Sequence, residues 1–239
     1  MDNKSKNIRL NRFIAMCGIC SRRKADELIK AGKISINKKS VTVVGQRVLQ
    51  GDVVCLDGRQ INPEKKKYLL LNKPKDYITT MCDEKNRKTA LDLVKNACQE
   101  RLVPVGRLDR KTTGLLLFTN DGELAKRLSH PKFMVKKIYQ VELNNVLLES
   151  ELLKIKTGFQ LEDGFVKADK INFVKNKKTK LQIQLHSGKN RIIRRVFEHF
   201  NHQVIKLDRV EYAFLKKNKL RLGEWRMLTK HELNQLKSI

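Results

Sequence analysis

Residues 104–124 read PVGRLDRKTTGLLLFTNDGEL, a stretch that predicts a loop, a buried strand and the start of a helix. The run Leu115–Thr119 is short and almost wholly apolar, which is typical of a strand covered on both faces. Asn120–Asp121 can cap a helix after it. The expected apolar face of that helix carries Leu124, Ala125 and Leu128. The loop before the strand begins at Gly106 and ends at Gly114, and glycines there suggest a tight path of the backbone.

Asp109 is the one acidic residue in this loop, among Arg107, Arg110 and Lys111. A carboxylate surrounded by cations stays ionised at neutral pH. An ionised carboxylate can serve as a nucleophile or as a general base. It can equally form a structural ion pair with an arginine, so the pattern leaves both interpretations open.

Further strands are expected on both sides of this stretch. Tyr68–Asn72 is apolar and ends before a proline, while residues 139–143 and 181–185 alternate apolar and polar side chains. Residues 89–98 are expected to be helical, and the lysine clusters at 175–180 and 216–219 are expected at solvated hairpin tips. Helices between several strands predict an α+β fold around a mostly antiparallel sheet over residues 68–239.

Residues 1–60 predict a separate small domain, joined by a polar linker at residues 61–67. Two helices are expected first, the second capped by Ser21 and ended at Gly32. Short strands are expected at 33–37, 41–44 and 53–56. The pair Asp57-Gly58 after the last of these strands indicates a hairpin turn.

A helix is expected over Lys189–Asn201, because its apolar residues fall on one face. Arg191, Arg194 and Arg195 fall on the opposite face, near its start. Cations at a helix N-terminus oppose the helix dipole, so an anion is needed nearby. It could be an acidic partner within the protein or a phosphate from outside. The alternative is a solvent-exposed, arginine-rich face.

The chain has 239 residues with a net charge of +27 and 40% apolar residues. The apolar share is enough for a core and excludes a disordered basic tail. Residues 1–67 carry a net +10 and the other 172 carry +17. This charge favours RNA or DNA as partner over a merely solvated basic surface. No apolar run is long enough for a membrane span, and residues 1–10 lack the apolar stretch of a secretory signal, so a soluble, cytoplasmic protein is expected.

Neither a metal nor a nucleotide cofactor is indicated. Cys17 and Cys20 form a C-x-x-C pair, but no second pair of ligands completes a zinc site, and no βαβ unit surrounds them. Five cysteines in a chain with no secretory signal are expected to be reduced thiols. The sequence also has no P-loop and no G-x-G-x-x-G.

The motifs together resemble RNA pseudouridine synthases of the RsuA/RluB/RluF group. The resemblance rests on GRLD at 106–109, TGLLL at 113–117, TNDGEL at 119–124, KIY at 137–139, GKNRIIRR at 188–195 and GEWRMLT at 223–229. Residues 9–37 are similar to an S4 RNA-binding domain. The ordered set covers nearly the whole chain.

The resemblance implies that the protein isomerises uridine in RNA to pseudouridine, without metal or cofactor. It implies that Asp109 is the essential aspartate, as nucleophile or base, and that Arg194 pairs with it. Tyr139 would lie beside the target base, which must be flipped out of the RNA. Leu185 would form an apolar wall.

The other candidate site residues are expected to bind RNA. In the catalytic domain they are Arg107, Arg191 and Arg195, through phosphates. In the S4 domain they are Arg9, Arg12, Arg22, Arg23 and Lys33. The expected substrate is ribosomal RNA, with 23S preferred because residues 119–123 are most like those of large-subunit enzymes, and a monomer is expected. The alternatives are a 16S rRNA or tRNA enzyme of the same group, or a non-catalytic S4-type protein that assists ribosome assembly.

Two positions depart from the pattern. Asn37-Lys38-Lys39 stands where S4 domains often have Asn-Gly-Lys, and Ile192 stands where the group often has Gln. Asn37 can adopt a left-handed conformation, so the S4 turn is expected to form. Ile192 puts a polar contact near the arginines in doubt.

Overall fold

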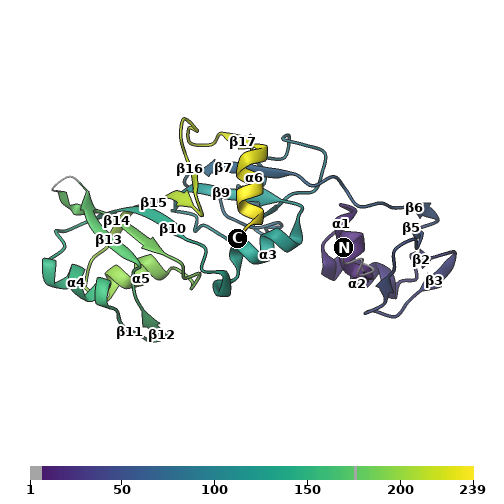
Figure 1. Cartoon of the computed structure of the whole chain (residues 1–239), viewed down its shortest axis with the longest axis horizontal. Coiled ribbons are helices and arrows are strands. Elements are labelled where there is room, and N and C mark those ends of the chain that lie inside the picture. Colours follow the sequence, from purple (N-terminus) through teal and green to yellow (C-terminus); the bar gives the residue numbers. More distant parts are fainter. Residues whose placement is uncertain (1–6, 175–176) are drawn as a thin grey trace. The chain divides into compact units, whose positions relative to one another are not determined.

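The computed structural model describes residues 7–174 and 177–239, and it divides the chain into two compact units (Figure 1). Unit 1 comprises the chain up to Lys67 together with Gln99–Leu102 and Asn120–Gly122, and unit 2 comprises the rest. Most of the N-terminal segment analysed for a secretory signal, and residues 175–176 of one lysine cluster, lie outside the described residues. None of the helices in the described chain has the length and apolar character that crossing a membrane requires.

Unit 1 has two helices followed by short strands. Its elements are β1 (Ile8–Arg9), α1 (Leu10–Met16), α2 (Arg22–Lys30), β2 (Ile34–Ile36), β3 (Lys39–Val41), β4 (Arg47–Val48), β5 (Val54–Leu56) and β6 (Arg59–Gln60). β1 pairs with β4, and the other strands form an antiparallel sheet in the order β3-β2-β5-β6. A small core holds helices and sheet together through Leu10, Ile14, Ala25, Ile29, Ile34, Val48 and Val54.

Local sequence signals explain most of unit 1. The Ser21 hydroxyl accepts a hydrogen bond from the Lys24 amide and caps α2 as expected. Asp57 and Gly58 both have positive φ, as the β5–β6 turn requires. Asn37 is left-handed as predicted, and Lys38 also takes a positive φ where glycine is usual. The strand expected at 41–44 is wrong beyond Val41, because Val43 and Val44 are exposed and the chain turns there.

Unit 2 is built on a nine-stranded sheet. Its strands are β7 (Tyr68–Lys73), β8 (Val103–Pro104), β9 (Thr113–Thr119), β10 (Lys137–Leu143), β13 (Lys170–Val174), β14 (Lys177–Leu185), β15 (Val204–Tyr212), β16 (Leu215–Lys216) and β17 (Trp225–Met227). The main order is β13-β14-β10-β15-β9-β7-β17, with β16 on β15 and β8 on β9. All pairs among the described strands are antiparallel except β9 with β15. A separate hairpin joins β11 (Phe159–Leu161) and β12 (Gly164–Val166).

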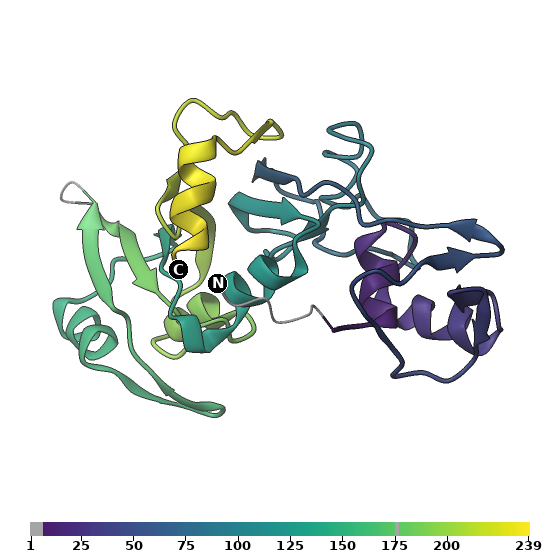
Figure 2. The same cartoon turned by 45° about the vertical axis from the view of Figure 1, so that its right-hand side comes forward.

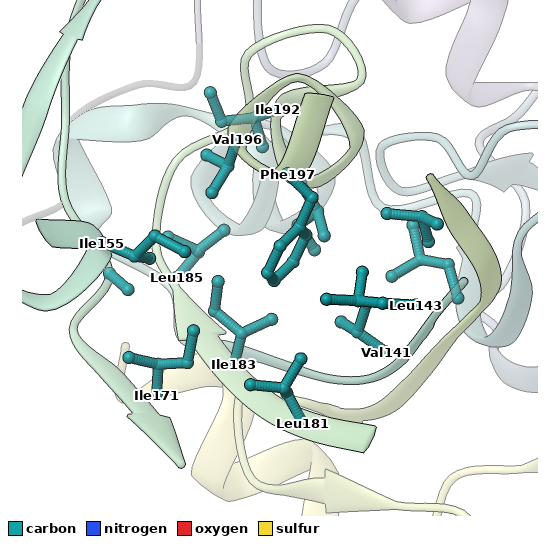
Figure 3. Close-up of a cluster of buried hydrophobic side chains, with 14 of the residues drawn as sticks. Val141, Leu143, Ile155, Ile171, Leu181, Ile183, Leu185, Ile192, Val196 and Phe197 are labelled. Atoms are coloured by element: carbon teal, nitrogen blue, oxygen red, sulfur yellow. The ribbon is translucent and has the colours of Figure 1, made fainter. Parts of the chain in front are cut away.

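The helices of unit 2 lie against this sheet (Figures 1 and 2) and form two hydrophobic cores with it. They are α3 (Gly122–Ser129), the short 3-10 helix at Pro131–Phe133, α4 (Glu149–Thr157), α5 (Ile192–Glu198) and α6 (Lys230–Lys237). In one core, Val196 and Phe197 of α5 point toward Ile183 and Val141 of the sheet (Figure 3). The other core packs α3 and α6 against β7 and β9. Unit 2 therefore has two packed halves along one continuous sheet.

Two predictions for unit 2 are wrong. Residues 89–98 form successive turns with i→i+3 hydrogen bonds instead of a helix, and Ala90 and Val94 fix them by burial. In the 216–219 cluster, Lys217 is not at a solvated tip, since its ammonium lies 2.5 Å from the Asp208 carboxylate. At residues 89–98 burial overrides helix propensity, and at Lys217 an ion pair replaces exposure to solvent.

Candidate active site

The Asp109 loop is held by short contacts within unit 2. It runs from the end of β8 to the start of β9, and the Thr112 amide donates to the Asp109 carbonyl at 3.0 Å. The Thr79 hydroxyl donates to the Leu108 carbonyl at 2.9 Å and accepts from the Leu108 amide at 3.3 Å. Arg110, expected beside Asp109, instead pairs with Asp76 at 2.9 Å. The loop therefore presents Asp109 at a fixed position.

Asp109 lines a cavity of about 420 Å³ on the face of the sheet. Tyr139, Arg107 and Arg191 line the same cavity, so the structure brings four of the predicted site residues together. Its wall includes Leu207, Ile192 and Ile193 of one hydrophobic core and Val105 and Tyr212 of the other. The cavity thus lies where the two packed halves of unit 2 meet, and its size is that of a small-molecule site.

A second cavity of about 550 Å³ adjoins the first. Both are lined by Arg107, Leu108, Asp109 and Arg191, and the second extends along the loop at residues 78–87. Its lining is mainly polar, with Arg87 held by Asp83 at 2.6 Å. Asp109 thus stands between two hollows that are open to solvent.

Arg194 occupies a different place from the one predicted. Helix α5 is shorter than expected, and Arg194 lies on its buried side with 8% exposure. Its Nη1 donates to the Val204 carbonyl at 2.9 Å. In the described part of the chain it forms no direct ion pair with Asp109, but the two charges interact. Burial and the neighbouring Arg191 lower the Arg194 pKa, and the Asp109 charge opposes this shift.

The remaining arginines of this segment have acidic partners inside the protein. Arg191 has a left-handed backbone before α5 and lies 3.7 Å from the Glu198 carboxylate. Arg195 pairs with Asp163 at 2.9 Å and does not line the cavity. Acidic partners therefore supply part of the negative charge that the cations near this helix start require. Both carboxylates are exposed enough for a phosphate to compete with them.

Leu185 does not form a wall of the cavity. It is 2% exposed and belongs to the core beneath α5 (Figure 3). On the sheet it faces Lys137 of the next strand. Leu185 therefore lies in the hydrophobic core next to the site.

The S4-type candidates all lie in unit 1. Arg9 precedes α1, Arg22 and Arg23 form the first turn of α2, and Lys33 precedes β2. These four are exposed and Arg12 is half-buried on α1. Within the same unit, the linker residue Glu64 accepts hydrogen bonds from the Arg101 amide and from Asn120, so the linker is held at this point.

Sequence reasoning missed three buried cations around the site. Lys73 is fully buried, and its ammonium donates to the Pro74 and Tyr77 carbonyls at 2.9 and 2.8 Å. Burial lowers its pKa to about 8, against the opposing charges of Asp109 and Asp76. Lys137 and Arg209 line the cavity itself. Lys137 lies two residues before Tyr139, so the alternation of a strand places both side chains on one face. This spacing could have predicted Lys137 as a residue of the site.

The described residues contain no group of three or more His, Cys, Asp or Glu side chains placed to hold a metal. All five cysteines are free thiols. Burial, and then the nearby Glu64 charge, raise the pKa of Cys17 to about 12, which makes this thiol unreactive. The ionisable groups that line the cavity are therefore one carboxylate, two tyrosines and several cations.

A cavity with these groups, on a chain of high positive charge, defines an enzyme that acts on a polyanion. Residues 67–199 match the RNA pseudouridylate synthase family, and residues 8–54 match the S4 domain. The chain belongs to the RNA pseudouridylate synthase family, whose members isomerise uridine in RNA.

The chain matches two relatives and a solved structure over almost its full length. The chain is 43% identical to ribosomal large subunit pseudouridine synthase B of Bacillus subtilis, covering 97% of this chain and 96% of that protein. It is 35% identical to the protein of the same name in Buchnera aphidicola, covering 95% and 96%. A crystal structure of a pseudouridylate synthase superposes with a TM-score of 0.69 at 26% identity, covering 96% and 99%.

Proposed function

We propose that this protein isomerises one uridine of ribosomal RNA to pseudouridine, and that the RNA is 23S rRNA. The relatives named as large-subunit enzymes support the choice of RNA. The observation that carries the chemistry is the cavity that Asp109 and Tyr139 line together with the exposed Arg107 and Arg191. A protein that only binds RNA has no need of a carboxylate there.

The reaction begins when the target uridine leaves the RNA stack, at a cost of a few kcal/mol. Arg107 and Arg191 are exposed at the cavity and can hold the distorted backbone through its phosphates. The base then enters between Tyr139 and the Asp109 loop. The Tyr139 ring offers a stacking surface for uracil, and its hydroxyl can relay the proton of uracil C5.

Asp109 acts on the sugar or the base as a nucleophile, or removes a ribose proton as a base. Both roles need an ionised carboxylate, and the Asp109 charge interacts with those of Lys73 and Arg194. The C1′–N1 bond breaks and a C1′–C5 bond forms, while C5 loses a proton and N1 gains one, so the reaction balances without metal or cofactor. The proposed active form is a monomer, and ribosomal RNA as substrate places the activity in the cytoplasm.

Tritium release from RNA labelled at uridine C5 tests this function. We expect release with the native protein and a loss of more than about 1,000-fold with Asp109→Asn, while RNA binding survives. Glu149→Gln, an exposed carboxylate on α4, is the matched control and should keep full activity. Release by Asp109→Asn at the native rate would overturn the role of Asp109.

The RNA target is tested separately. Mapping pseudouridines in the ribosomal RNA of a strain that lacks this gene should show one missing site in 23S rRNA. A missing site in 16S rRNA or tRNA instead would overturn the proposed substrate and leave the chemistry standing.

A further inference from the structure

Two buried cations lie on the inner wall of the active-site cavity. Lys137 is 9% exposed and Arg209 is 2% exposed, and both line the cavity with Tyr139. Lys137 precedes Tyr139 by two residues on β10, and Arg209 is the register partner of Tyr139 on β15. All three side chains therefore belong to the same region of the sheet face.

The partners of both cations are neutral. The Lys137 ammonium donates to the His186 and Ser187 carbonyls at 3.0 and 3.5 Å. The Arg209 Nε donates to the Leu115 carbonyl at 2.7 Å, and its guanidinium lies 4.7 Å from the centre of the Tyr212 ring. Among the residues that the structure describes, its buried Nη2 has no hydrogen-bond partner, and neither does the Thr112 hydroxyl in the same cavity. In the described residues neither cation forms an ion pair with a carboxylate.

Such an arrangement is costly in the free protein. A buried cation loses its hydration, and carbonyl dipoles restore only part of it. Burial, and then the charge of Arg209, lower the Lys137 pKa to about 8. Unpaired buried charge of this kind is typical of functional sites, where a ligand completes the charge balance.

The position of the two cations indicates which anion they meet. Arg107 and Arg191 line the same cavity but are exposed, so the RNA phosphates reach these arginines first. Lys137 and Arg209 lie deeper, among Tyr139, Tyr212 and Leu207, which suit a flat base better than a phosphate. The group that arrives there is the uracil of the flipped nucleotide.

We propose that Lys137 and Arg209 stabilise the negative charge that uracil acquires when its glycosidic bond breaks. The inference rests on the proposed isomerase function. When the C1′–N1 bond breaks, its electron pair stays on uracil and spreads over N1, O2 and O4. The base turns, C5 bonds to C1′ and loses its proton, and N1 takes up a proton. Two cations in a low-dielectric wall favour this charged stage over the neutral ground state.

Single-turnover tritium release with enzyme in excess tests the inference, with RNA affinity measured separately. We expect Lys137→Met to lower the rate about 100-fold, Arg209→Met to do the same, and RNA affinity to stay within about twofold. Lys137→Arg keeps the charge and should restore the rate to within about tenfold of native. Lys136→Met is the matched control, because Lys136 is the chain neighbour, pairs with Glu211 and does not line the cavity.

The pH dependence gives a readout that a purely structural role would not change. The native rate should fall above about pH 8 as Lys137 loses its proton, and Lys137→Arg should show a smaller fall, because, of these two lysines, only Lys73, whose pKa is also about 8, still titrates there. Ionisation of uracil itself affects the pH profiles of the native protein and of Lys137→Arg equally. The charged and titratable groups beside Lys137 and in the cavity are Arg209, Tyr212, Tyr139, Asp169, His186, Asp109, Lys189, Arg107 and Arg191.

Three outcomes would overturn the inference. The first is a fall of less than about threefold with Lys137→Met. The second is weaker RNA binding with a flatter salt dependence and an unchanged rate, which indicates a phosphate contact. The third is the same pH profile for native protein and Lys137→Arg. If the native protein releases no tritium from ribosomal RNA, the proposed function fails first, and the inference fails with it.

Discussion

The two units of this protein both expose cations, but among the described residues only unit 2 buries them. In unit 1, Arg22, Arg23 and Lys33 are exposed on the surface. In unit 2, Lys73, Lys137, Arg194 and Arg209 are among the buried residues of the chain. Exposed cations attract a long polyanion, and salt screens them. Buried cations act on one group at short range, and water screens them little. The difference indicates docking by one unit and chemistry in the other.

The largest expected effect concerns packing around the buried cations. Gly114 on β9 has a φ of +114°, and an added Cβ would lie 2.4 Å from the Arg209 carbonyl oxygen and 2.5 Å from the Arg209 amide nitrogen. Both are backbone atoms of the parallel β9–β15 pair, so neither can move easily. We expect Gly114→Ala to lower the free energy of unfolding of unit 2 by about 3 kcal/mol or more. Urea unfolding followed by Trp225, the single tryptophan, measures it.

Gly58 in unit 1 is the matched control. Its φ is +80°, but an added Cβ would meet nothing within 4 Å. Gly58→Ala should therefore cost only the backbone strain, about 1 kcal/mol. The Ile61 amide donates to the Val54 carbonyl beside this turn, so its hydrogen-exchange rate measures the loss of stability. Equal losses of unfolding free energy in the two variants would show that the close approach at Gly114 does not contribute to stability.

The next effect separates a buried arginine from its exposed neighbour. Arg194→Met removes a charge that interacts with Asp109, so single-turnover tritium release should fall about 100-fold with little change in RNA affinity. Arg195→Met removes a more exposed charge already paired with Asp163, and it should lower the rate by less than about tenfold. Trp225 fluorescence checks that both variants are folded. A larger loss of rate with Arg195→Met than with Arg194→Met would contradict the expectation that the buried arginine acts on the reaction and the exposed one does not.

The smallest effect belongs to the exposed cations of unit 1. We expect Arg22→Ala combined with Arg23→Ala to weaken RNA affinity about tenfold and to reduce the slope of log affinity against log salt by about 1.4. The single-turnover rate at saturating enzyme should not change. Both residues lie in the first turn of α2, where cations oppose the helix dipole, so their removal should not unfold the helix.

Lys30→Ala, at the other end of α2, is the control and should change RNA affinity less. A fall in the saturated rate with Arg22→Ala and Arg23→Ala would indicate that unit 1 takes part in the chemistry as well as in docking.

The sequence predicted well wherever a short-range rule decides the structure. Ser21 caps α2 because its hydroxyl reaches an amide three residues away, and Asp57-Gly58 turns because both residues accept a positive φ. The buried strand in the 104–124 stretch follows from its apolar run. The helix expected at 89–98 is wrong, because burial of Ala90 and Val94 by distant residues fixes a series of turns.

Within the site, the sequence by itself determined the residue types and their order. It singled out Asp109 as a carboxylate among cations and placed Tyr139 on an alternating strand, and the family match confirms the class of enzyme. The specific roles of these residues stay predictions. Only the tertiary structure decided which cations are buried. It showed Arg194 and Arg209 buried in unit 2, Leu185 in the hydrophobic core, and Arg110 paired with Asp76. Charge counts cannot give this, because burial depends on which strands and helices pack together across more than 100 residues of chain.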